Sequence, residues 1–157
     1  MSAGKRILLG CGIVVAAGAV VLGLVIAWMV YVSEDIDGAS VSIRSPLDVR
    51  VGETFTLEVD VKNERPEDVL TVADIDISAS YLDGFAVVST APAYKSGTHV
   101  PFLDTVSHTF DTRIDAGATA TFAFTLRAEH AGIFRGDIDV YEGSRLTTTI
   151  AQTVVKD

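Results

Sequence analysis

The stretch that decides the fold class runs from Ala120 to Leu126 and reads Ala-Thr-Phe-Ala-Phe-Thr-Leu. Apolar residues stand at every second position from residue 120, with small or polar residues between them. A period of two places successive side chains on opposite faces of an extended chain, so this stretch predicts a β-strand with one buried face. The pair Ala116-Gly117 just before it predicts a turn.

Upstream of this stretch the alternation recurs. Apolar residues alternate over 47–51 and over 55–61, on either side of a turn at Gly52-Glu53. Between residues 70 and 79 the apolar positions change parity partway. We therefore expect a β-bulge or a break near Ala73.

Downstream the alternation continues over 134–140 and 146–154, around a hairpin at 142–144. No amphipathic helical pattern separates these short segments, which favours antiparallel pairing over a βαβ arrangement. We predict an all-β fold, an antiparallel immunoglobulin-like sandwich of seven to nine strands over residues 41–157. A chain of about 120 residues can bury a two-sheet core without disulfides.

The N-terminal part differs in composition from the rest of the chain, because it contains a long apolar segment. Residues 7–32 form an uninterrupted run of 26 residues without a charge. As a helix this run is about 39 Å long, more than the roughly 30 Å hydrocarbon thickness of a bilayer. We predict a transmembrane helix over 7–32, a cytoplasmic N-terminus over 1–6 and a linker over 33–40.

The flanks of the run predict its orientation. Lys5 and Arg6 precede it, and carboxylates within 34–37 follow it, so the positive-inside rule places the N-terminus in the cytoplasm. Trp28 and Tyr31 are then expected at the far membrane interface, with Lys5 and Arg6 at the near one. The remaining domain is expected outside the cytoplasm.

Two processing signals are alternatives to a permanent anchor. Residues 8–11 resemble a lipobox ending at Cys11, but a lipoprotein signal has its apolar segment before the cysteine and here it follows. A small-x-small site at 17–19 would leave an apolar N-terminus after cleavage. A permanent anchor is favoured over both.

The predicted helix carries one stripe of small side chains. They are Gly12, Ala16, Ala19, Gly23 and Ala27. At 100° per residue these positions fall within about 80° of one another, and close backbone approach along such a stripe associates membrane helices. The stripe predicts packing against another subunit or a second copy of the chain. A plain anchor remains the alternative, because the run is rich in Gly and Ala.

Charge and cysteine content exclude several classes of function. The net charge is −9, and all 21 acidic residues but only ten of the 12 basic ones follow the apolar run, which gives that part −11. Such a surface repels phosphate backbones, so no nucleic-acid partner is expected. The single cysteine, Cys11, excludes an intrachain disulfide framework and a Cys-based zinc site. We expect no cofactor.

Two Asp-x-Asp pairs are the main candidates for ligand chemistry. Asp74 and Asp76, like Asp137 and Asp139, each share one face of a predicted strand. Solvated strand faces are the favoured interpretation. Calcium binding stays open, although no EF-hand pattern accompanies the pairs.

Catalytic signatures are not found in the sequence. The histidines His99, His108 and His130 have no metal-binding spacing, and no G-x-S-x-G elbow occurs. His108 shares parity with apolar neighbours and is expected to be a partly buried structural residue. The Arg-Gly-Asp tripeptide at 135–137 falls within a predicted strand, which favours a chance occurrence. We predict a protein that is not an enzyme.

The most plausible contact surface is a long loop predicted over 91–103. Tyr94, Lys95, His99 and Phe102 combine aromatic and cationic groups in an otherwise acidic domain, and interfaces favour aromatic anchors. The alternative is that Phe102 and Leu103 cap the end of the sandwich.

Five short motifs in order give the chain a family resemblance. They are Val51-Gly52-Glu53-Thr54-Phe55, Val61-Lys62-Asn63, Asp83-Gly84-Phe85, Asp115-Ala116-Gly117-Ala118 and Ala131-Gly132-Ile133-Phe134. This order resembles bacterial immunoglobulin-like sandwiches of the CARDB type. Ala116 departs from the pattern, where the family usually has proline. The resemblance implies a sandwich and is nearly silent on function, since such modules serve adhesion, assembly and accessory roles.

These observations predict a non-catalytic, single-span accessory or interaction subunit of a bacterial membrane or envelope complex. Its helix would dock laterally in the inner membrane, and its sandwich, in the periplasm or outside, would cover or tether the partner. The expected partners are membrane lipid and other membrane subunits or a second copy; a small molecule is not expected. The alternative is a membrane-anchored module for adhesion or for binding a protein, a glycan or calcium.

Overall fold

The computed structural model describes residues 18–27 and 35–157, which belong to two separate units, 1–34 and 35–157. In the first unit, residues 18–27 are helical, and their large apolar side chains are exposed. Among the described residues, no helix has both the length and the hydropathy needed to cross a bilayer. The rest of the span predicted over 7–32 lies outside the described residues.

The predicted helix positions are therefore only partly described. Ala19, Gly23 and Ala27 lie in the helical segment, four residues apart. The other predicted positions lie outside the described residues: Gly12, Ala16, Lys5, Arg6, Trp28 and Tyr31. A Cβ added at Gly23 would meet no atom within 4 Å, so the side of the helix at Gly23 is open. Helix packing remains a prediction.

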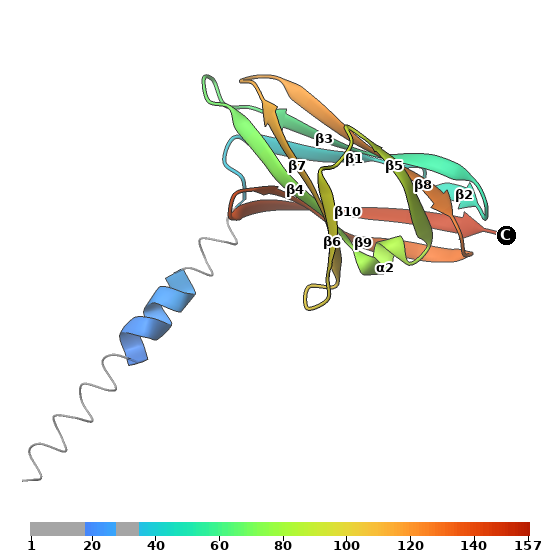
Figure 1. Cartoon of the computed structure of the whole chain (residues 1–157), viewed down its shortest axis with the longest axis horizontal. Coiled ribbons are helices and arrows are strands. Elements are labelled where there is room, and N and C mark those ends of the chain that lie inside the picture. The colour runs from blue at the N-terminus through green and yellow to red at the C-terminus, as the bar shows by residue number, and fades with distance from the viewer. Residues whose placement is uncertain (1–17, 28–34) are drawn as a thin grey trace, which may run out of the picture. The chain divides into compact units, whose positions relative to one another are not determined.

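Residues 35–157 form two packed β-sheets, which confirms the all-β sandwich (Figure 1). The four-stranded sheet has the order β1 (Ala39–Arg44), β3 (Thr54–Asn63), β8 (Thr119–Ala128) and β5 (Phe85–Ala91). The six-stranded sheet has the order β2 (Asp48–Arg50), β10 (Arg145–Lys156), β9 (Gly132–Glu142), β4 (Leu70–Ser78), β7 (Thr105–Ile114) and β6 (Ser96–Val100). A single helical turn, α2 (Ala79–Leu82), connects the sheets between β4 and β5.

The ten strands of this unit exceed the seven to nine predicted. The long loop predicted over 91–103 is wrong in part, because it contains β6, which pairs with β7 over five residues. Pro92, Gly97 and Pro101 predicted a loop, but the two prolines flank the strand and only the glycine lies within it. Strand β6 lies at the edge of the six-stranded sheet. A glycine inside a strand weakens it, so the local sequence alone pointed to a loop.

Strand β8 confirms the alternation that decided the fold class. It lies between β3 and β5, and Phe122, Phe124 and Leu126 are fully buried. Burying side chains of this size stabilises a fold by about 1.5–3 kcal/mol each. Phe122 and Phe124 pack edge-on against Phe110 of β7, so the central strand of one sheet contacts the other sheet directly.

The bulge expected near Ala73 is confirmed, because the β4–β7 register shifts between Val72 and Asp74. Val72 before the bulge and Ile75 after it are both buried, despite their opposite parity. A bulge adds one residue to a strand and so restores the inward direction of the apolar side chains. As a result Asp74 and Asp76 alternate with core residues and face outward.

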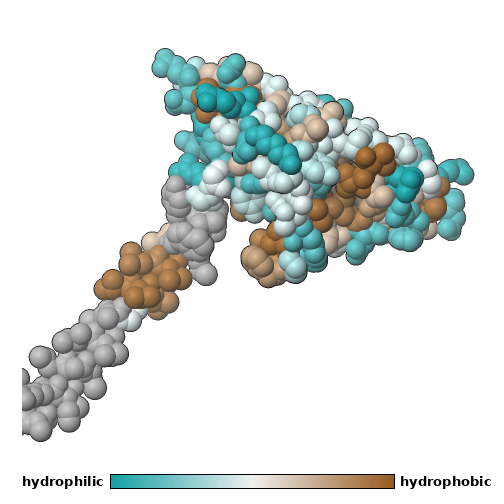
Figure 2. All heavy atoms as spheres, viewed as in Figure 1, coloured by the Kyte–Doolittle hydropathy of each residue, from teal (hydrophilic) through white to brown (hydrophobic). Residues whose placement is uncertain are grey.

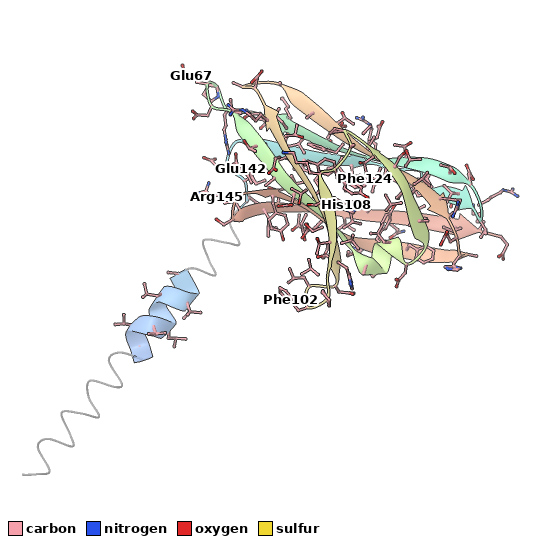
Figure 3. All side chains as sticks on the ribbon, in the orientation of Figure 1. Glu67, Phe102, His108, Phe124, Glu142 and Arg145 are labelled. Carbon is pink, nitrogen blue, oxygen red and sulfur yellow. The ribbon has the colours of Figure 1, made fainter. Side chains whose placement is uncertain are left out.

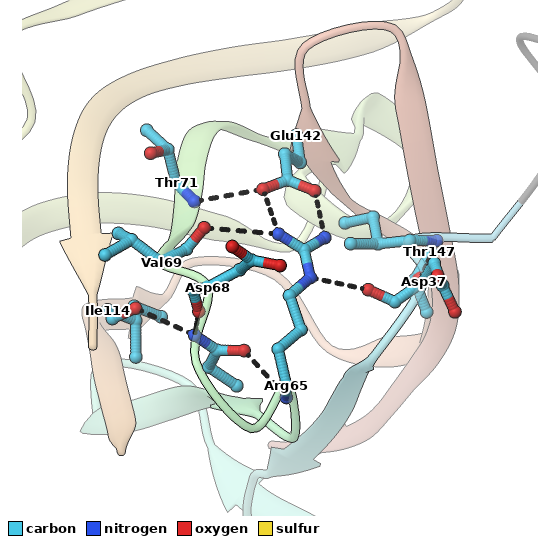
Figure 4. Close-up of polar contacts among 10 residues, drawn as sticks. Asp37, Arg65, Asp68, Val69, Thr71, Ile114, Glu142 and Thr147 are labelled. Carbon is cyan, nitrogen blue, oxygen red and sulfur yellow. Dashed lines mark hydrogen bonds and ion pairs between the residues drawn. The ribbon is translucent and has the colours of Figure 1, made fainter. Parts of the chain in front are cut away.

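The end of the sandwich nearest the predicted linker is held by Arg65, in the β3–β4 loop (Figure 4). Its guanidinium donates to both carboxylate oxygens of Glu142, at 2.9 and 2.5 Å, and to the carbonyl oxygen of Asp37 at 2.9 Å. The amide of Thr71 also donates to Glu142. The hydrogen bonds from Arg65 hold the pKa of Glu142 below its usual value. The β3–β4 loop, the end of β9 and the start of the domain are thereby joined at one ion pair.

Candidate functional site

The candidate site lies on the outer face of the six-stranded sheet, where polar side chains from five strands stand in one row. Thr98 of β6 is opposite Ser107 of β7, and Ser107 is opposite Asp76 of β4. Asp76 is opposite Asp139 of β9, which in turn is opposite Thr148 of β10. Directly opposed residues in antiparallel strands have Cβ atoms about 4.5–5.5 Å apart. The register therefore brings the two Asp-x-Asp pairs together.

Hydroxyl groups satisfy two of these carboxylates. Thr148 donates to Asp139 at 2.6 Å, and Thr109 of β7 donates to Asp74 at 2.7 Å. Asp76 differs, because it is 6% exposed and its Oδ1 has no hydrogen-bond partner among the described residues. A buried carboxylate oxygen without a donor carries an uncompensated desolvation cost.

Burial raises the pKa of Asp76; a hydrogen bond from Ser107 opposes this, and the charges of Asp74 and Asp139 add to it. Burial likewise raises the pKa of Asp139, with a further contribution from Asp137. The charges that act on both groups are thus other carboxylates. Like charges close together disfavour ionisation. The row is a site of negative potential.

A pocket of about 220 Å³ opens on this row. It is lined by Asp74, Asp76, Ser107, Tyr141 and Leu103. Leu103 reaches it from the β6–β7 turn, which is tied to the start of α2 by a hydrogen bond from the Ala79 amide to the Asp104 carbonyl oxygen, at 2.8 Å. The lining of the pocket therefore combines carboxylates with an apolar side chain.

The pKa of Tyr141 reflects the negative charges around this pocket. Burial, followed by the charges of Asp76, Asp139 and Asp74, raises the pKa of its phenol to about 12. A phenolate is disfavoured beside carboxylates, so the hydroxyl stays protonated at neutral pH. The site therefore offers anionic acceptors and one neutral aromatic ring.

The sequence placed both members of each Asp pair on one face, and this is confirmed. It did not reveal that Asp76 is opposite Asp139, because the alignment of β4 with β9 is not encoded in either strand alone. No group of three or more acidic, histidine or cysteine side chains is placed to hold a metal ion in the described parts of the chain. Calcium binding at the pairs receives no support from this geometry.

The predicted interface loop is divided by strand β6. Tyr94 and Lys95 precede the strand, His99 lies within it, and Phe102 lies in the turn that follows. Lys95 pairs with Asp111 at 3.0 Å. The four residues do not form one loop surface.

Phe102 is 85% exposed, and Leu103 beside it is 53% exposed. The alternative that these two residues cap the sandwich end is therefore wrong. Figure 3 shows Phe102 directed away from the domain at the hairpin tip, and Figure 2 shows hydrophobic residues at the surface there. Phe102 has the highest exposed fraction among the large hydrophobic residues in the described part of the chain.

His108 is buried between the sheets, more completely than expected. Its ring packs edge-on between Tyr94 and Phe124, with centroid distances of 5.2 Å to each. Burial lowers its pKa. Its Nδ1 has no hydrogen-bond partner among the described residues. These contacts assign His108 to the core.

The Arg-Gly-Asp tripeptide lies within β9, as predicted. Gly136 packs so closely on Ser78 and Tyr81 that an added Cβ would collide with both. The glycine is therefore required by the contact between β9 and α2. Arg135 and Asp137 line a shallow depression of about 420 Å³ with Ser78, Ser80 and Ile150.

No family model matches this chain, and no curated protein sequence matches it. Its fold is similar to many solved structures at low identity. A chain named BspA_C_WT is 9% identical with a TM-score of 0.50, and the match covers 74% of this chain and half of that one. AvmM, described as catalysing macrocyclization in alchivemycin A biosynthesis, is 9% identical with a TM-score of 0.48, over 78% of this chain and 90% of that one.

A CARDB domain of a Pyrococcus furiosus protein, described as in complex with di-metal ions, is also among the similar structures. It is 14% identical with a TM-score of 0.41, over 80% of this chain and 96% of that one. Likeness at this level concerns the fold alone. The comparisons therefore assign neither a family nor an activity to this chain.

Proposed function

We propose that this chain is a non-catalytic interaction subunit of a bacterial membrane or envelope complex. It is anchored in the inner membrane by one helix over 7–32 and presents its sandwich on the outer side. The observation that carries the proposal is the exposed apolar tip at Phe102 and Leu103 of the β6–β7 hairpin. Adjacent exposed apolar residues at a hairpin tip are typical of a protein contact.

Two further features support the anchor. Residues 18–27 are helical and uncharged, with exposed apolar side chains such as Val20, Leu24 and Ile26. A helix that is apolar all round is stable only in a core or in a membrane. The charge flanks of the run, Lys5-Arg6 before it and the carboxylates within 34–37 after it, support an outer location for the sandwich.

The tip contact is tested by photo-cross-linking in cells that make the full chain. Phe102 is replaced by p-benzoylphenylalanine, and Ile133, also exposed but on β9, is replaced in a matched control. We expect a discrete adduct from position 102 and none from position 133. Equal labelling from both positions, or none from 102, contradicts the proposal.

The anchor is tested in the same cells. The full chain should fractionate with the inner membrane, and its sandwich should be digested by protease only after the outer envelope is opened. A chain found soluble after cell lysis contradicts the anchor.

The docking stripe is tested separately by Ala19→Leu and Gly23→Leu, with Val20→Leu as a control on a different side of the helix. If the stripe packs on a partner helix, the first two variants lose the complex on purification in mild detergent and the control retains it. Retention by all three variants supports a plain anchor and leaves the tip contact unaffected.

A further inference from the structure

We propose that the pocket lined by Asp74, Asp76, Ser107, Tyr141 and Leu103 binds a single basic side chain, a lysine ammonium or an arginine guanidinium, of a partner protein. The inference rests on the proposed function, since it names the chemistry of the partner. The pocket is called the carboxylate pocket below. It is distinct from the apolar tip, although Leu103 contributes to both.

The first argument is the unsatisfied acceptor. Asp76 is buried and lines the carboxylate pocket, and its Oδ1 accepts no hydrogen bond from the described residues. A charged donor would satisfy this oxygen with a charge-assisted hydrogen bond, roughly twice as strong as a neutral one. A neutral donor would leave the charge uncompensated. The pocket therefore selects for a cation.

The second argument is the surrounding charge. Asp74 lines the pocket with Asp76, and Asp139 stands opposite Asp76 on the next strand. Burial and neighbouring carboxylates raise the pKa of Asp76, so its protein surroundings disfavour the carboxylate charge. The domain beyond the apolar run has a net charge of −11, which speeds the approach of basic partners.

The third argument is the volume of the pocket and the chemistry of the side chains that line it. A volume of about 220 Å³ is below the roughly 300–1,000 Å³ of sites for whole small molecules, but it suits one long side chain. Leu103 and the ring of Tyr141 provide apolar contact for a methylene stem while the charged head reaches Asp76. The Tyr141 ring also attracts a cation at its face. A divalent metal fits less well, because no three ligands converge in the described parts of the chain.

The test titrates the full chain in detergent micelles at low ionic strength with an acetylated, amidated tetra-arginine peptide. Binding is followed by the carboxyl and ring NMR signals of labelled Asp and Tyr. We expect the wild-type protein to bind with shifts concentrated at Asp76 and Tyr141. Asp76→Asn should weaken binding about tenfold or more, as for loss of a charged hydrogen-bond partner.

Asp115→Asn is the matched control, because it removes the same charge in the β7–β8 turn outside the pocket. It should change affinity less than about twofold, as expected for a screened surface charge. A second measurement needs no variant. Affinity of the wild-type protein should fall as pH is lowered through the pKa of Asp76, since protonation removes the acceptor charge.

Three outcomes overturn the inference. Equal weakening in Asp76→Asn and Asp115→Asn indicates general attraction to an acidic surface. Displacement of the peptide by micromolar calcium chloride indicates a metal site. Absence of peptide binding to wild-type protein, while the cross-link from position 102 persists, refutes the carboxylate pocket and leaves the proposed function standing.

Discussion

Two carboxylates on β9, Glu142 and Asp139, lie three residues apart in opposite electrostatic settings. Glu142 receives two hydrogen bonds from Arg65 and one from the Thr71 amide, and its pKa is lowered. Asp139 receives one from a threonine hydroxyl, faces Asp76 and has a raised pKa. The comparison shows that burial alone does not decide the role of a carboxylate. The donors that surround it do.

The Arg65–Glu142 pair acts as a structural joint, since each charge is compensated within the domain. Asp76 and Asp139 contribute like charges to one face without such compensation. A group that costs stability when folded is a candidate for function, because binding can supply the missing partner. The predictions below use stability and pKa to separate these two settings.

The largest effect is expected from Arg65→Met, which keeps the packing of the stem and removes the donors. Arg65 and Glu142 are only 19% and 23% exposed, so Glu142 would remain partly buried without its partner. We expect a loss of about 2–3 kcal/mol in the free energy of unfolding. Urea unfolding of the full chain in detergent, followed by β-sheet circular dichroism, measures it. Arg127→Met, which breaks an exposed pair with Glu129, should change stability little.

The substitution Asp76→Asn is expected to raise the free energy of unfolding, in contrast to Arg65→Met. The amide keeps the shape of the side chain and removes a charge that the folded state disfavours. We expect a gain of roughly 0.5–1 kcal/mol at pH 7 by the same measurement. A loss as large as that of Arg65→Met would mean that the Asp76 charge is compensated within the domain, and the contrast between the two settings would fail.

The pH dependence of stability should separate the two groups as well. The pKa of Asp76 is higher in the folded protein than its ordinary value of 3.8. The stabilisation that comes from protonated Asp76 is therefore fully present below pH 3.8 and is lost as pH rises through the pKa of the folded state. The pKa of Glu142 is lower in the folded protein than its ordinary value of 4.5. The stabilisation that comes from ionised Glu142 is therefore present above pH 4.5 and is lost as pH falls through the pKa of the folded state.

The advantage of Asp76→Asn over wild type should therefore grow from about pH 4 to pH 7. The disadvantage of Glu142→Gln should shrink as pH falls below about 4.5. Unfolding curves at several pH values check both trends. Parallel curves for wild type and either variant would contradict the corresponding assignment.

The smallest expected effect is a change in the pKa of Tyr141. The pKa of Tyr141 is raised to about 12, first by burial and then by Asp76, Asp139 and Asp74. In Asp76→Asn this pKa should fall but stay above 10.0, because burial remains. Tyrosine ring-carbon NMR follows the titration, with Tyr141→Phe assigning the signal. An unchanged Tyr141 titration would show that Asp76 does not act on the pocket.

Much of the fold could be predicted from local pattern. The alternation around Phe122 and Phe124 and the parity change at Ala73 are properties of single segments, and both correspond to the structure. Strand β6 was missed because its pairing with β7, and not its own composition, makes it a strand. Propensity is weakest at such edges, where few side chains are buried.

The polar contacts, those of the candidate site included, were less predictable, for a related reason. Arg65 and Glu142 are 77 residues apart, and no local signal pairs them. The row through Asp76 and Asp139 depends on the register of β4 with β9, and the burial of Asp76 depends on how the sheet and its turns pack. Phe102 was predicted as a contact residue from its aromatic character; it is exposed in the structure, and its role in a contact stays a prediction.

The extra residue at the β4 bulge gives this strand one position at which its length can change. Deleting Ala73 would place Leu70, Val72, Ile75 and Ile77 at every second position, so these side chains would stay inward while Asp74 and Asp76 stayed outward. In a strand without a bulge, removing one residue exchanges the two faces beyond the deletion. Ala73 is therefore the residue that β4 can lose while keeping its core.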